Sequence, residues 1–480
     1  MEKFIGRQHE IAELEQLYNS GRPEFVVVYG RRRVGKTFLI RSIFATRMAF
    51  SHAALSPVEF ESQQLSQNQL LAFHTSLVNH GAIDDTLPTN WFEAFDRLRD
   101  FLVKRRALYD GRQVVFIDEL PWMDVKGSGF VTALEHFWNN WASAQNDIML
   151  IVCGSATSWM NDNLLNNYGG LYGRITAEFK LSPFSLKECE AYYQSRGIVM
   201  NRYDQVQCYM AMGGIPYYLS LLKSGLSLSQ NLDNLFFGHN GRLRLEFERL
   251  FNSLFSSPEP YVKVVKLLSG KREGYTRLEI SEHTKIPYGG GLSQILKGLE
   301  VSDFIQSYLR YQGSKREVHF RLTDHFVLFY LTFISGHPEH GETFWSDNCL
   351  LPSLNAWRGF AFESICFTHI EAIKNALGVR LVKSTHSPWR SKGSKPWQID
   401  LVIERADRVI NLCEMKFFNK EYEITKQYEE ELRNKVAAFI DETKCRMSVH
   451  PTLVTTFGLV KNAYSGFFQN VITLDDLFGG

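Results

Sequence analysis

The sequence lacks any window approaching eighteen consecutive apolar residues, which argues against an ordinary membrane-spanning helix. Its N-terminus, MEKFIGRQHE, mixes acids and bases where a secretory signal peptide needs a long apolar core. An excess of charge of either sign is also absent, since the formal net charge is only +1. Composition therefore indicates no membrane partner and does not by itself predict a nucleic-acid partner.

Cysteine is scarce and scattered, and the seven thiols include no C-x-x-C pair. Most of them lie in apolar stretches, so we expect reduced, buried thiols in a cytoplasmic protein. Internal repeats and low-complexity segments are absent as well. At 480 residues the chain is too long for one hydrophobic core, and we expect roughly two to four domains.

Short apolar runs alternate with amphipathic stretches over residues 1–180. The runs EFVVVYG (24–30), QVVFIDEL (113–120) and IMLIVCGS (148–155) are typical of parallel strands that are buried on both faces. Between them, FLIRSIFATRM, NWFEAFDRLRDFLVKRR and FVTALEHFWNNWASA space their apolar residues by three and four, as helices do. The predicted fold class is therefore α/β, with a parallel sheet of the nucleotide-binding type in this first domain.

The rest of the chain predicts three further parts. Residues 181–257 are mainly helical and could form a lid on the first domain, with SLKECEAYYQSRG, RYDQVQCYMAMGG and LEFERLFNSLF as the candidate helices. Residues 258–335 follow the order helix, turn, helix and β-hairpin, which is the order of a winged helix. After a linker at 336–356, residues 357–480 combine the helix WRGFAFESICFTHIEAIKNAL with strand-like QIDLVIER, VINLCEMKFF and TLVTTFG, which predicts a second α/β domain.

A candidate phosphate loop follows the first strand, because GRRRVGKT fits the pattern G-x-x-x-x-G-K-[ST]. Its glycines let backbone N–H groups converge on phosphates at a helix N-terminus, its lysine reaches phosphate oxygens, and its threonine hydroxyl ligates magnesium. The alternative is a basic surface turn, but a strand before and a helix after favour ATP and Mg²⁺. The predicted contacts are Gly30, Arg31, Arg32, Arg33, Val34, Gly35, Lys36 and Thr37.

Two adjacent carboxylates, Asp118 and Glu119, end the apolar run VVFID about eighty residues later. In a P-loop fold, Asp118 at this position would hold magnesium and Glu119 would polarise the attacking water. In isolation, Asp118 would be better explained as the cap of a following helix. Its pairing with the phosphate loop reverses that preference.

Two further polar residues are candidates for the same reaction. Ser155, after the third strand, could sense the γ-phosphate or align the water, and a helix N-cap is an equally good interpretation. Arg174 is a candidate arginine finger that would stabilise transition-state charge. A solvent-facing ion pair is the alternative for Arg174, and a finger could act within its own subunit or on a neighbouring copy.

Six segments carry a family resemblance over about the first 230 residues. In order and spacing, FIGRQHEIAEL, YGRRRVGKT, FIDELPWM, CGSATSWM, LYGRITAEFKLSPFS and GGIPYYL resemble archaeal-type ATPases of the AAA+/STAND grouping. The resemblance implies that Phe4, Gly6 and Arg7 lie beside the adenine, and that Gly214 and Pro216 belong to the lid. It also implies a winged helix and a C-terminal nuclease-like domain.

A second group of carboxylates lies in the C-terminal domain. Asp400 followed by Glu414 and Lys416 is similar to the D…(D/E)-x-K arrangement of PD-(D/E)xK nucleases, although Ile399 replaces the proline of the family name. Strand residues two apart share one face, so Glu414 and Lys416 would point together toward Asp400. The two acids could hold Mg²⁺ and the lysine could orient or deprotonate water. Glu363 corresponds to the helix-borne acid of such nucleases, and Gln427 is a weaker match to their occasional glutamine.

An ion pair in any amphipathic hairpin could produce the same pattern, so the sequence around it is informative. Residues 372–399 contain no acid and form a predicted basic loop that could neutralise a nucleic-acid backbone, with Trp389 and Trp397 for stacking. An ordinary solvated loop is the alternative. The bases are Lys374, Arg380, Lys383, Arg390, Lys392 and Lys395.

Three functions remain open. We favour an ATP-hydrolysing switch or motor coupled to a magnesium-dependent nuclease-like domain that acts on DNA. The alternative is a STAND-like signalling or scaffold ATPase whose C-terminal domain binds a partner or nucleic acid without cleavage. A site-specific DNA-binding regulator is least favoured, because the recognition segment YGGGLSQILKGLE carries only Lys297 as a base. A second copy of the chain is a further candidate partner.

Overall fold

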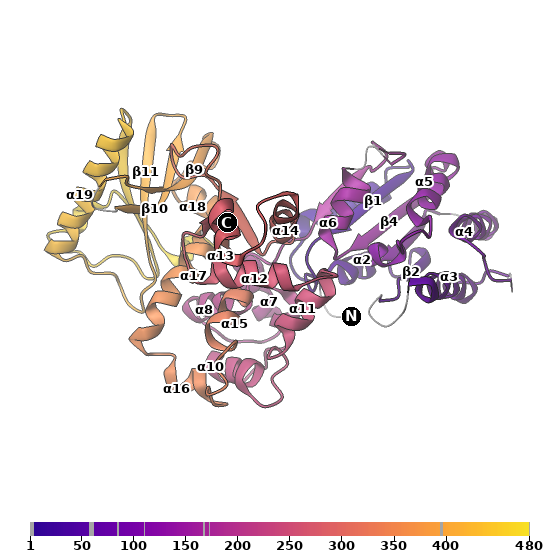
Figure 1. The fold of residues 1–480 in the computed structure, drawn as a ribbon, viewed down its shortest axis with the longest axis horizontal. Helices are drawn as coiled ribbons and strands as arrows, with labels where there is room; N and C mark the ends of the chain where they lie inside the picture. Colours follow the sequence, from indigo (N-terminus) through magenta and orange to yellow (C-terminus); the bar gives the residue numbers. More distant parts are fainter. Residues whose placement is uncertain are drawn as a thin grey trace. The chain divides into compact units, whose positions relative to one another are not determined.

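The computed structural model describes residues 4–56, 62–83, 86–109, 111–166, 169–171, 173–393 and 397–479, without the side chains of residues 62, 63 and 353. Lys395 of the predicted basic loop lies outside these ranges. The chain divides into two compact units, Met1–Ser182 and Pro183–Gly480. Each unit has its own sheet structure, which Figure 1 shows.

A five-stranded parallel sheet in the order β2-β3-β4-β1-β5 organises the first unit. The predicted strands at 24–30, 113–120 and 148–155 are confirmed as β1, β3 and β4. The expected helix 38–48 was wrong at its end, because α2 stops at Phe44 and Met48 already belongs to β2. The strands are β1 (Glu24–Tyr29), β2 (Met48–Ala53), β3 (Gln113–Asp118), β4 (Ile148–Gly154) and β5 (Ala177–Lys180).

Helices cover both faces of this sheet because alternate strand residues point to opposite sides. Phe25 and Val27 of β1 join the core that α3, α4 and α5 contribute. On α1 and α2, the rings of Tyr18 and Phe44 lie 5.7 Å apart. The helices and helical turns are α1 (Gln8–Tyr18), α2 (Lys36–Phe44), α3 (Ser62–Asn79), α4 (Trp91–Arg106), η2 (Leu120–Met123), α5 (Phe130–Asn140), η3 (Ala142–Ala144), α6 (Thr157–Met160) and η4 (Asn161–Leu165).

The second unit begins with helices, and the three that the sequence predicted between 185 and 255 are confirmed as α7, α8 and α11. Ser185 and Glu188 form a capping box that starts α7. Aromatic side chains of this helical part pack together, as with Phe236 and Phe329 at 4.7 Å. The elements are α7 (Leu186–Ser195), α8 (Arg202–Met212), α9 (Pro216–Leu219), α10 (Leu228–Leu232), η5 (Asp233–Phe237), α11 (Glu246–Leu254), α15 (His325–Phe333), α16 (Phe344–Asn348) and η6 (Pro352–Leu354).

A small antiparallel sheet in the order β6-β8-β7 lies within residues 259–322. The expected first helix and hairpin are present, while the two-residue strand β6 was not predicted. Gly274 precedes β6 with φ +65, and a Cβ there would collide with the carbonyl of Phe320, so glycine is required. The elements are α12 (Glu259–Ser269), β6 (Tyr275–Thr276), α13 (Arg277–Thr284), α14 (Gly290–Val301), β7 (Ile305–Tyr308) and β8 (His319–Leu322).

The C-terminal part contains a mixed five-stranded sheet in the order β13-β12-β11-β10-β9. Strands β9, β10 and β11 are antiparallel neighbours, whereas β11, β12 and β13 run parallel. The single helix expected at 357–377 is divided at His369 into α17 and α18. The elements are α17 (Asn355–Thr368), α18 (Ile370–Ala376), β9 (Ser384–Arg390), β10 (Gln398–Arg405), β11 (Val409–Lys416), α19 (Lys426–Thr443), β12 (Ser448–Thr455), η7 (Ser465–Phe467), β13 (Asn470–Ile472) and α20 (Leu474–Phe478).

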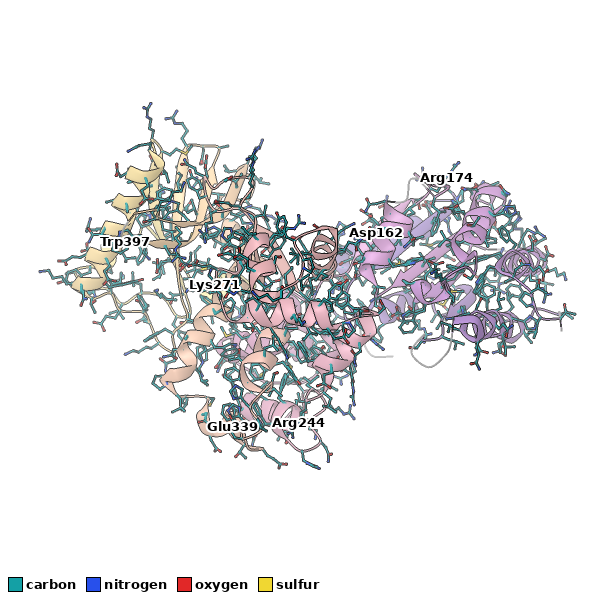
Figure 2. All side chains as sticks on the ribbon, viewed as in Figure 1. Asp162, Arg174, Arg244, Lys271, Glu339 and Trp397 are labelled. Atoms are coloured by element: carbon teal, nitrogen blue, oxygen red, sulfur yellow. The ribbon has the colours of Figure 1, made fainter. Side chains whose placement is uncertain are left out.

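The prediction of a basic loop at 372–399 was wrong in its secondary structure, because β9 occupies residues 384–390. Its proposed stacking residue Trp389 is only 4% exposed and packs edge-on against Phe439 of α19. The tryptophan therefore belongs to the core between the sheet and α19. Trp397, labelled in Figure 2, is partly exposed and packs against the same core.

Neither a membrane-spanning helix nor a disulfide occurs among the described residues. Among the described residues, no helix has the length and apolar character needed to cross a membrane. None of the seven cysteines, all of which are described, forms a disulfide. Five of them are buried, while Cys349 and Cys445 are partly exposed.

Candidate functional sites

The phosphate loop connects β1 to α2 in the first unit. Gly30 leaves the strand with φ +143, and a Cβ there would collide with the carbonyl oxygen of Leu181 beyond β5. Gly35 has φ +91 and is the N-cap of α2, which starts at Lys36. The loop thus needs glycine at both motif positions, for close packing at Gly30 and for a left-handed backbone at both.

Lys36 is folded back over the loop that precedes it. Its Nζ donates to the carbonyl oxygens of Gly30 at 2.9 Å and Arg31 at 3.1 Å. The side chain is buried, and this burial lowers the pKa of the ammonium, although Glu119 opposes the shift. A buried ammonium whose partners are neutral carbonyls is suited to receive an anion such as a phosphate group.

Asp118 at the end of β3 lies directly opposite the start of α2. The Thr37 hydroxyl donates to its Oδ2 at 2.8 Å, and the backbone N–H of Glu119 donates to its Oδ1 at 3.1 Å. Burial raises the pKa of Asp118, and the neighbouring Glu119 adds to the rise. Asp118 does not cap the following turn η2, whose N-cap is Glu119.

Glu119 and Ser155 are brought together from the ends of β3 and β4. The hydroxyl of Ser155 donates to Glu119 Oε2 at 2.8 Å, and its backbone N–H donates to the same oxygen at 3.1 Å. Ser155 therefore does not act as the N-cap of α6, which is Ala156. Glu119 has φ 51, a left-handed conformation that is uncommon for a glutamate and is often found at functional sites.

The N-terminal segment lies beside the helix that begins at the phosphate loop. Phe4 stacks on Phe38 of α2 with ring centroids 5.6 Å apart, and Phe38 is half exposed. Gly6 and Arg7 both have positive φ, and Arg7 donates to the carbonyl of Ser182. An apolar platform next to the phosphate loop can accommodate a flat base.

The remaining residues predicted for the nucleotide site are spread over the loop, the turn before β5 and the second unit. Arg31 is buried in the loop, whereas Arg32 and Arg33 are partly exposed and Val34 is buried. Arg174 is exposed in the turn before β5, as Figure 2 shows. Pro216 starts the short helix α9 of the second unit, so it lies outside the unit that carries the loop.

The donor set of this site fits ATP with magnesium. A buried lysine and a glycine-shaped loop can receive phosphate oxygens, and the Thr37 hydroxyl with the Asp118 carboxylate offers the oxygen ligands that Mg²⁺ prefers. The loop that leads from β1 to Lys36 and Thr37 leaves the carboxyl end of that strand, and Asp118 ends the parallel strand β3, which is the edge where ligands bind in α/β sheets.

The second group of carboxylates also converges, in the C-terminal part of the second unit. Glu363 comes from α17, Asp400 from β10, and Glu414 with Lys416 from the neighbouring strand β11. The backbone N–H of Met415 donates to Asp400 Oδ2 at 3.0 Å, and Lys416 Nζ lies 3.0 Å from Glu414 Oε1. Glu414 and Lys416 share one face of β11, as the sequence predicted.

Cations of the chain already contact all three carboxylates. Arg272, in the turn between α12 and β6, bridges Glu363 and Asp400, with 2.6 Å to Asp400 Oδ1. From α19, Lys435 Nζ lies 2.7 Å from Glu414 Oε2. The sequence did not predict Arg272 or Lys435 as partners of these acids. Gln427, which it did predict for this site, is exposed. Tyr428 completes the set, since its hydroxyl donates to Glu414 Oε1 at 3.0 Å.

The surroundings lower the pKa of Glu414 and raise the pKa values of Asp400 and Glu363. Burial would raise the pKa of Glu414, but Lys416 and Lys435 hold it below its usual range. Burial and the charge of Glu414 raise the pKa of Asp400, and burial together with Asp400 raises that of Glu363 well above its usual range. The carboxylates of Asp400 and Glu363 raise the pKa of Arg272 although burial opposes its charge.

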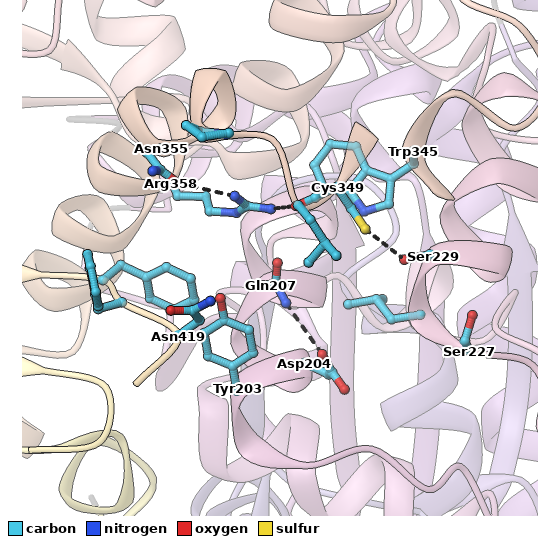
Figure 3. A pocket seen from close by; sticks show the side chains of 15 residues that line it. Tyr203, Asp204, Gln207, Ser227, Ser229, Trp345, Cys349, Asn355, Arg358 and Asn419 are labelled. Carbon is cyan, nitrogen blue, oxygen red and sulfur yellow. Dashed lines mark hydrogen bonds between the residues drawn. The ribbon is translucent and has the colours of Figure 1, made fainter. Parts of the chain in front are cut away.

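A cavity of about 500 Å³ lies elsewhere in the second unit, beside the chain that leaves β11 (Figure 3). Tyr203 and Phe417 line it and stack with ring centroids 4.9 Å apart. Arg358 also lines it, but its guanidinium donates to the carbonyl of Cys349 and to Asn355 Oδ1. The lining mixes polar and apolar groups, and its arginine is engaged by the protein itself.

One further cluster of potential metal ligands occurs in the described part of the chain. His337, Glu339 and His340 follow α15, with Glu339 labelled in Figure 2. The two imidazole rings stack in parallel at 4.8 Å, and His340 Nδ1 is 2.8 Å from the carbonyl oxygen of Phe333. Parallel stacked rings do not direct their nitrogens at one point, so we assign no site here.

Residues 4–222 match the family model described as an ATPase domain predominantly from Archaea. An uncharacterized protein of Methanocaldococcus jannaschii is 24% identical over 446 residues, which cover 92% of this chain and 93% of that protein. A Walker-type ATPase of Pyrococcus abyssi is similar in structure, at 19% identity and a TM-score of 0.46, over 69% of this chain and 96% of that one. The ORC2 protein of Aeropyrum pernix is similar at 14% identity and a TM-score of 0.41, over 69% and 95%.

The family match, the parallel sheet and the phosphate loop support an ATPase of the P-loop group. The match includes the whole first unit from residue 4 and extends through α9 of the second. It ends before the second carboxylate group, about which it carries no information.

Proposed function

We propose that this chain is an ATP-hydrolysing switch or motor whose nucleotide state controls a magnesium-dependent, nuclease-like domain acting on DNA. The observation that carries the first half is the meeting of Lys36, Thr37 and the two carboxylates of Asp118 and Glu119 at one edge of a parallel sheet. Each of these groups has a task in phosphoryl transfer.

In this proposal Lys36 exchanges its two carbonyl partners for phosphate oxygens, and Thr37 with Asp118 holds Mg²⁺. When bound, the metal supplies positive charge that stabilises the charge developing on the phosphate oxygens. Glu119, oriented by two hydrogen bonds from Ser155, polarises the attacking water. Arg174 would supply a further positive charge, from its own subunit or from a neighbouring copy.

The nuclease half rests on the convergence of Glu363, Asp400, Glu414 and Lys416 from one helix and two adjacent strands. Asp400 and Glu414 would hold Mg²⁺, and Lys416 would orient the water that attacks a phosphodiester. DNA is the proposed substrate because the arrangement resembles PD-(D/E)xK nucleases. Of the exposed basic side chains in this region, Lys392 lies beside the start of β10 and supports a polyanionic substrate, whereas Lys383 lies opposite the far end of that strand.

The segment 259–322 is the proposed connection between the two activities. Its order of helix, short strand, two helices and hairpin fits a winged helix. Arg272 of this segment contacts Glu363 and Asp400, so a movement of the segment would change the ion pairs of the second carboxylate group.

A second candidate function is a STAND-like signalling or scaffold ATPase whose C-terminal domain binds without cleaving. The observation that favours it is that Arg272, Lys416 and Lys435 already neutralise the carboxylates. A cluster of buried ion pairs can serve structure alone.

The two candidates are separated by a cleavage assay with the purified full chain. Linear single-stranded, linear double-stranded and supercoiled DNA are each incubated with Mg²⁺, with and without ATP, beside an Asp400→Asn protein. The nuclease proposal expects cleavage in at least one condition that requires Mg²⁺ and disappears in Asp400→Asn. DNA binding without cleavage in every condition, even after the blocking contact described below is removed, would support the scaffold instead.

A further inference from the structure

The second carboxylate group is closed. The side chains of Glu363, Asp400 and Glu414 are only 9%, 7% and 8% exposed, although a nuclease must admit both a metal ion and a phosphodiester. Arg272 is the partner that remains 40% exposed while it touches two of these acids. The Arg272 side chain therefore reaches the two acids from the protein surface, and its guanidinium occupies carboxylate oxygens that an incoming cation would need.

Arg272 is held in this position by the turn that carries it. The N–H of Gly274 donates to the carbonyl of Lys271 at 2.8 Å, which closes a tight turn around Arg272 and Glu273. Arg390 of β9 donates to the Glu273 carboxylate, and the hydroxyl of Tyr308 donates to the Glu273 carbonyl at 2.6 Å. The turn is thus clamped to the C-terminal sheet on one side and to its own hairpin on the other; Figure 2 labels Lys271 at its start.

Each acid of the site already has a cationic partner without any added ion. Three carboxylates, Glu363, Asp400 and Glu414, are matched by Arg272, Lys416 and Lys435. Mg²⁺ binds through carboxylate oxygens, and a guanidinium binds the same oxygens through its N–H groups. A metal ion and Arg272 consequently compete for Asp400 and Glu363.

We propose that Arg272 is a built-in inhibitor of the C-terminal carboxylate site, which opens to a divalent cation and a phosphodiester only when the turn 271–274 withdraws. This inference rests on the proposed nuclease function. The competitor that could draw the turn away is a polyanion, because a backbone phosphate and Glu273 would compete for Arg390 and for Arg310, whose Nη2 lies 3.6 Å from Glu273.

The test measures Mn²⁺ binding to the nucleotide-free full chain by titration calorimetry and by the loss of the free-ion signal in electron paramagnetic resonance. All proteins carry Asp118→Asn, so that the nucleotide site does not contribute. In this background we compare the unchanged site with Arg272→Gln. Arg316→Gln is the matched control, because Arg316 is an exposed arginine of the same segment, in the turn between β7 and β8.

We expect Arg272→Gln to bind Mn²⁺ roughly tenfold or more tightly than its parent, since the metal no longer displaces an ion pair. Arg316→Gln should bind like the parent, and adding Asp400→Asn to Arg272→Gln should remove the gained site. Unchanged Mn²⁺ affinity in folded Arg272→Gln overturns the inference.

A cleavage assay on the same Arg272→Gln substitution with Asp118 intact separates this inference from the nuclease proposal. Gained Mn²⁺ binding with gained DNA cleavage supports both, whereas gained binding without cleavage supports the inhibitor and contradicts the nuclease. Equal, full cleavage by wild type and Arg272→Gln supports the nuclease and overturns the inhibitor. If the single variant does not fold, Arg272→Gln with Glu363→Gln removes one charge of each sign and leaves Asp400 and Glu414 for the titration, where the same gain over the parent is expected.

Discussion

The two groups of carboxylates in this protein have different hydrogen-bond and ion-pair partners. In the first unit, Asp118 and Glu119 receive hydrogen bonds from the hydroxyls of Thr37 and Ser155, which carry no charge. In the second unit, Glu414 is held between Lys416 and Lys435, and Arg272 bridges the other two acids. One group is hydrogen-bonded by hydroxyls and the other is compensated by cations.

This difference predicts which group accepts a metal ion without rearrangement. Hydroxyl donors orient carboxylates but leave their negative charge in place, so a cation can add to the site. Protein cations cancel that charge, so a metal must first displace them. A cluster of acids in a sequence is therefore insufficient evidence for a metal site until its counter-charges are known.

The largest expected effect concerns Lys36, the one ammonium of the described residues that bonds both Gly30 and Arg31 of the loop. Lys36→Ala should lower kcat for ATP hydrolysis by roughly 10²-fold or more, because a preorganised charge next to the phosphates is lost. Steady-state phosphate release measures it. Lys126→Ala, an exposed lysine of the same unit, should hydrolyse ATP like wild type, and normal hydrolysis by Lys36→Ala would contradict the assigned site.

Glu414→Gln should reduce the free energy of unfolding by about 3 kcal/mol, because Lys416 and Lys435 lose their common counter-ion in a buried place. Asp118→Asn should reduce it by only about 1 kcal/mol in nucleotide-free protein, since the amide oxygen can still accept from Thr37 and only the N–H of Glu119 loses its acceptor. Urea unfolding compares the two. Glu421→Gln, an exposed carboxylate near β11, is the control, and equal effects at 414 and 118 would remove the distinction between the sites.

Ser155 orients Glu119 and should have a smaller effect on catalysis. Ser155→Ala is expected to lower kcat about tenfold with KM for ATP little changed, because Glu119 loses the hydroxyl donor but keeps the backbone donor. Ser155→Thr retains a hydroxyl and should recover most of the rate. A rise in KM alone would instead indicate a role in nucleotide binding.

The smallest effect is a difference in pH dependence. Lys416 and Lys435 depress the pKa of Glu414, so its contribution to stability is complete above about pH 4.5 and is lost as the pH falls through the folded pKa. By pH 4 the advantage of wild type over Glu414→Gln should shrink by about 1 kcal/mol. Burial raises the pKa of Asp118, so wild type should gain on Asp118→Asn over the same acid range. Urea unfolding between pH 7 and pH 4 measures how the stability difference between wild type and each variant changes with pH. A change of the same sign for both variants would contradict the opposite pKa shifts of Glu414 and Asp118.

Much of the first unit follows from local sequence. Continuous apolar runs predicted three central strands of the parallel sheet, and the spacing of Gly30, Gly35 and Lys36 predicted the loop after β1. The edge strands β2 and β5 were not identified individually, because MAFSHA and AEFK mix polar with apolar residues. The sequence permits two interpretations of Ser155; the structure makes Ala156 the N-cap of α6, while Ser155 donates to Glu119.

In the second unit, the sequence did not predict the cations that surround the second carboxylate group. The strand pattern correctly put Glu414 and Lys416 on one face, but Arg272 lies 128 residues from Asp400 and carries no signal in its own segment. Tyr428 and Lys435 are seven residues apart and so share a face of α19, a spacing that the sequence contains. Which way that face points is decided by the packing of α19 on the sheet.

The sequence by itself determined the α/β class, the parallel nucleotide sheet, the phosphate loop and the acids of both groups, because periodicity and short motifs are local properties of a chain. The tertiary structure decided which charges surround those acids, since the neighbours of a buried carboxylate come from distant segments. Arg272 enters from one such segment and Lys435 from another. The free energy of a charge in a protein interior depends on those neighbours, so similar carboxylate motifs can be open to a cation in one unit and covered in the other.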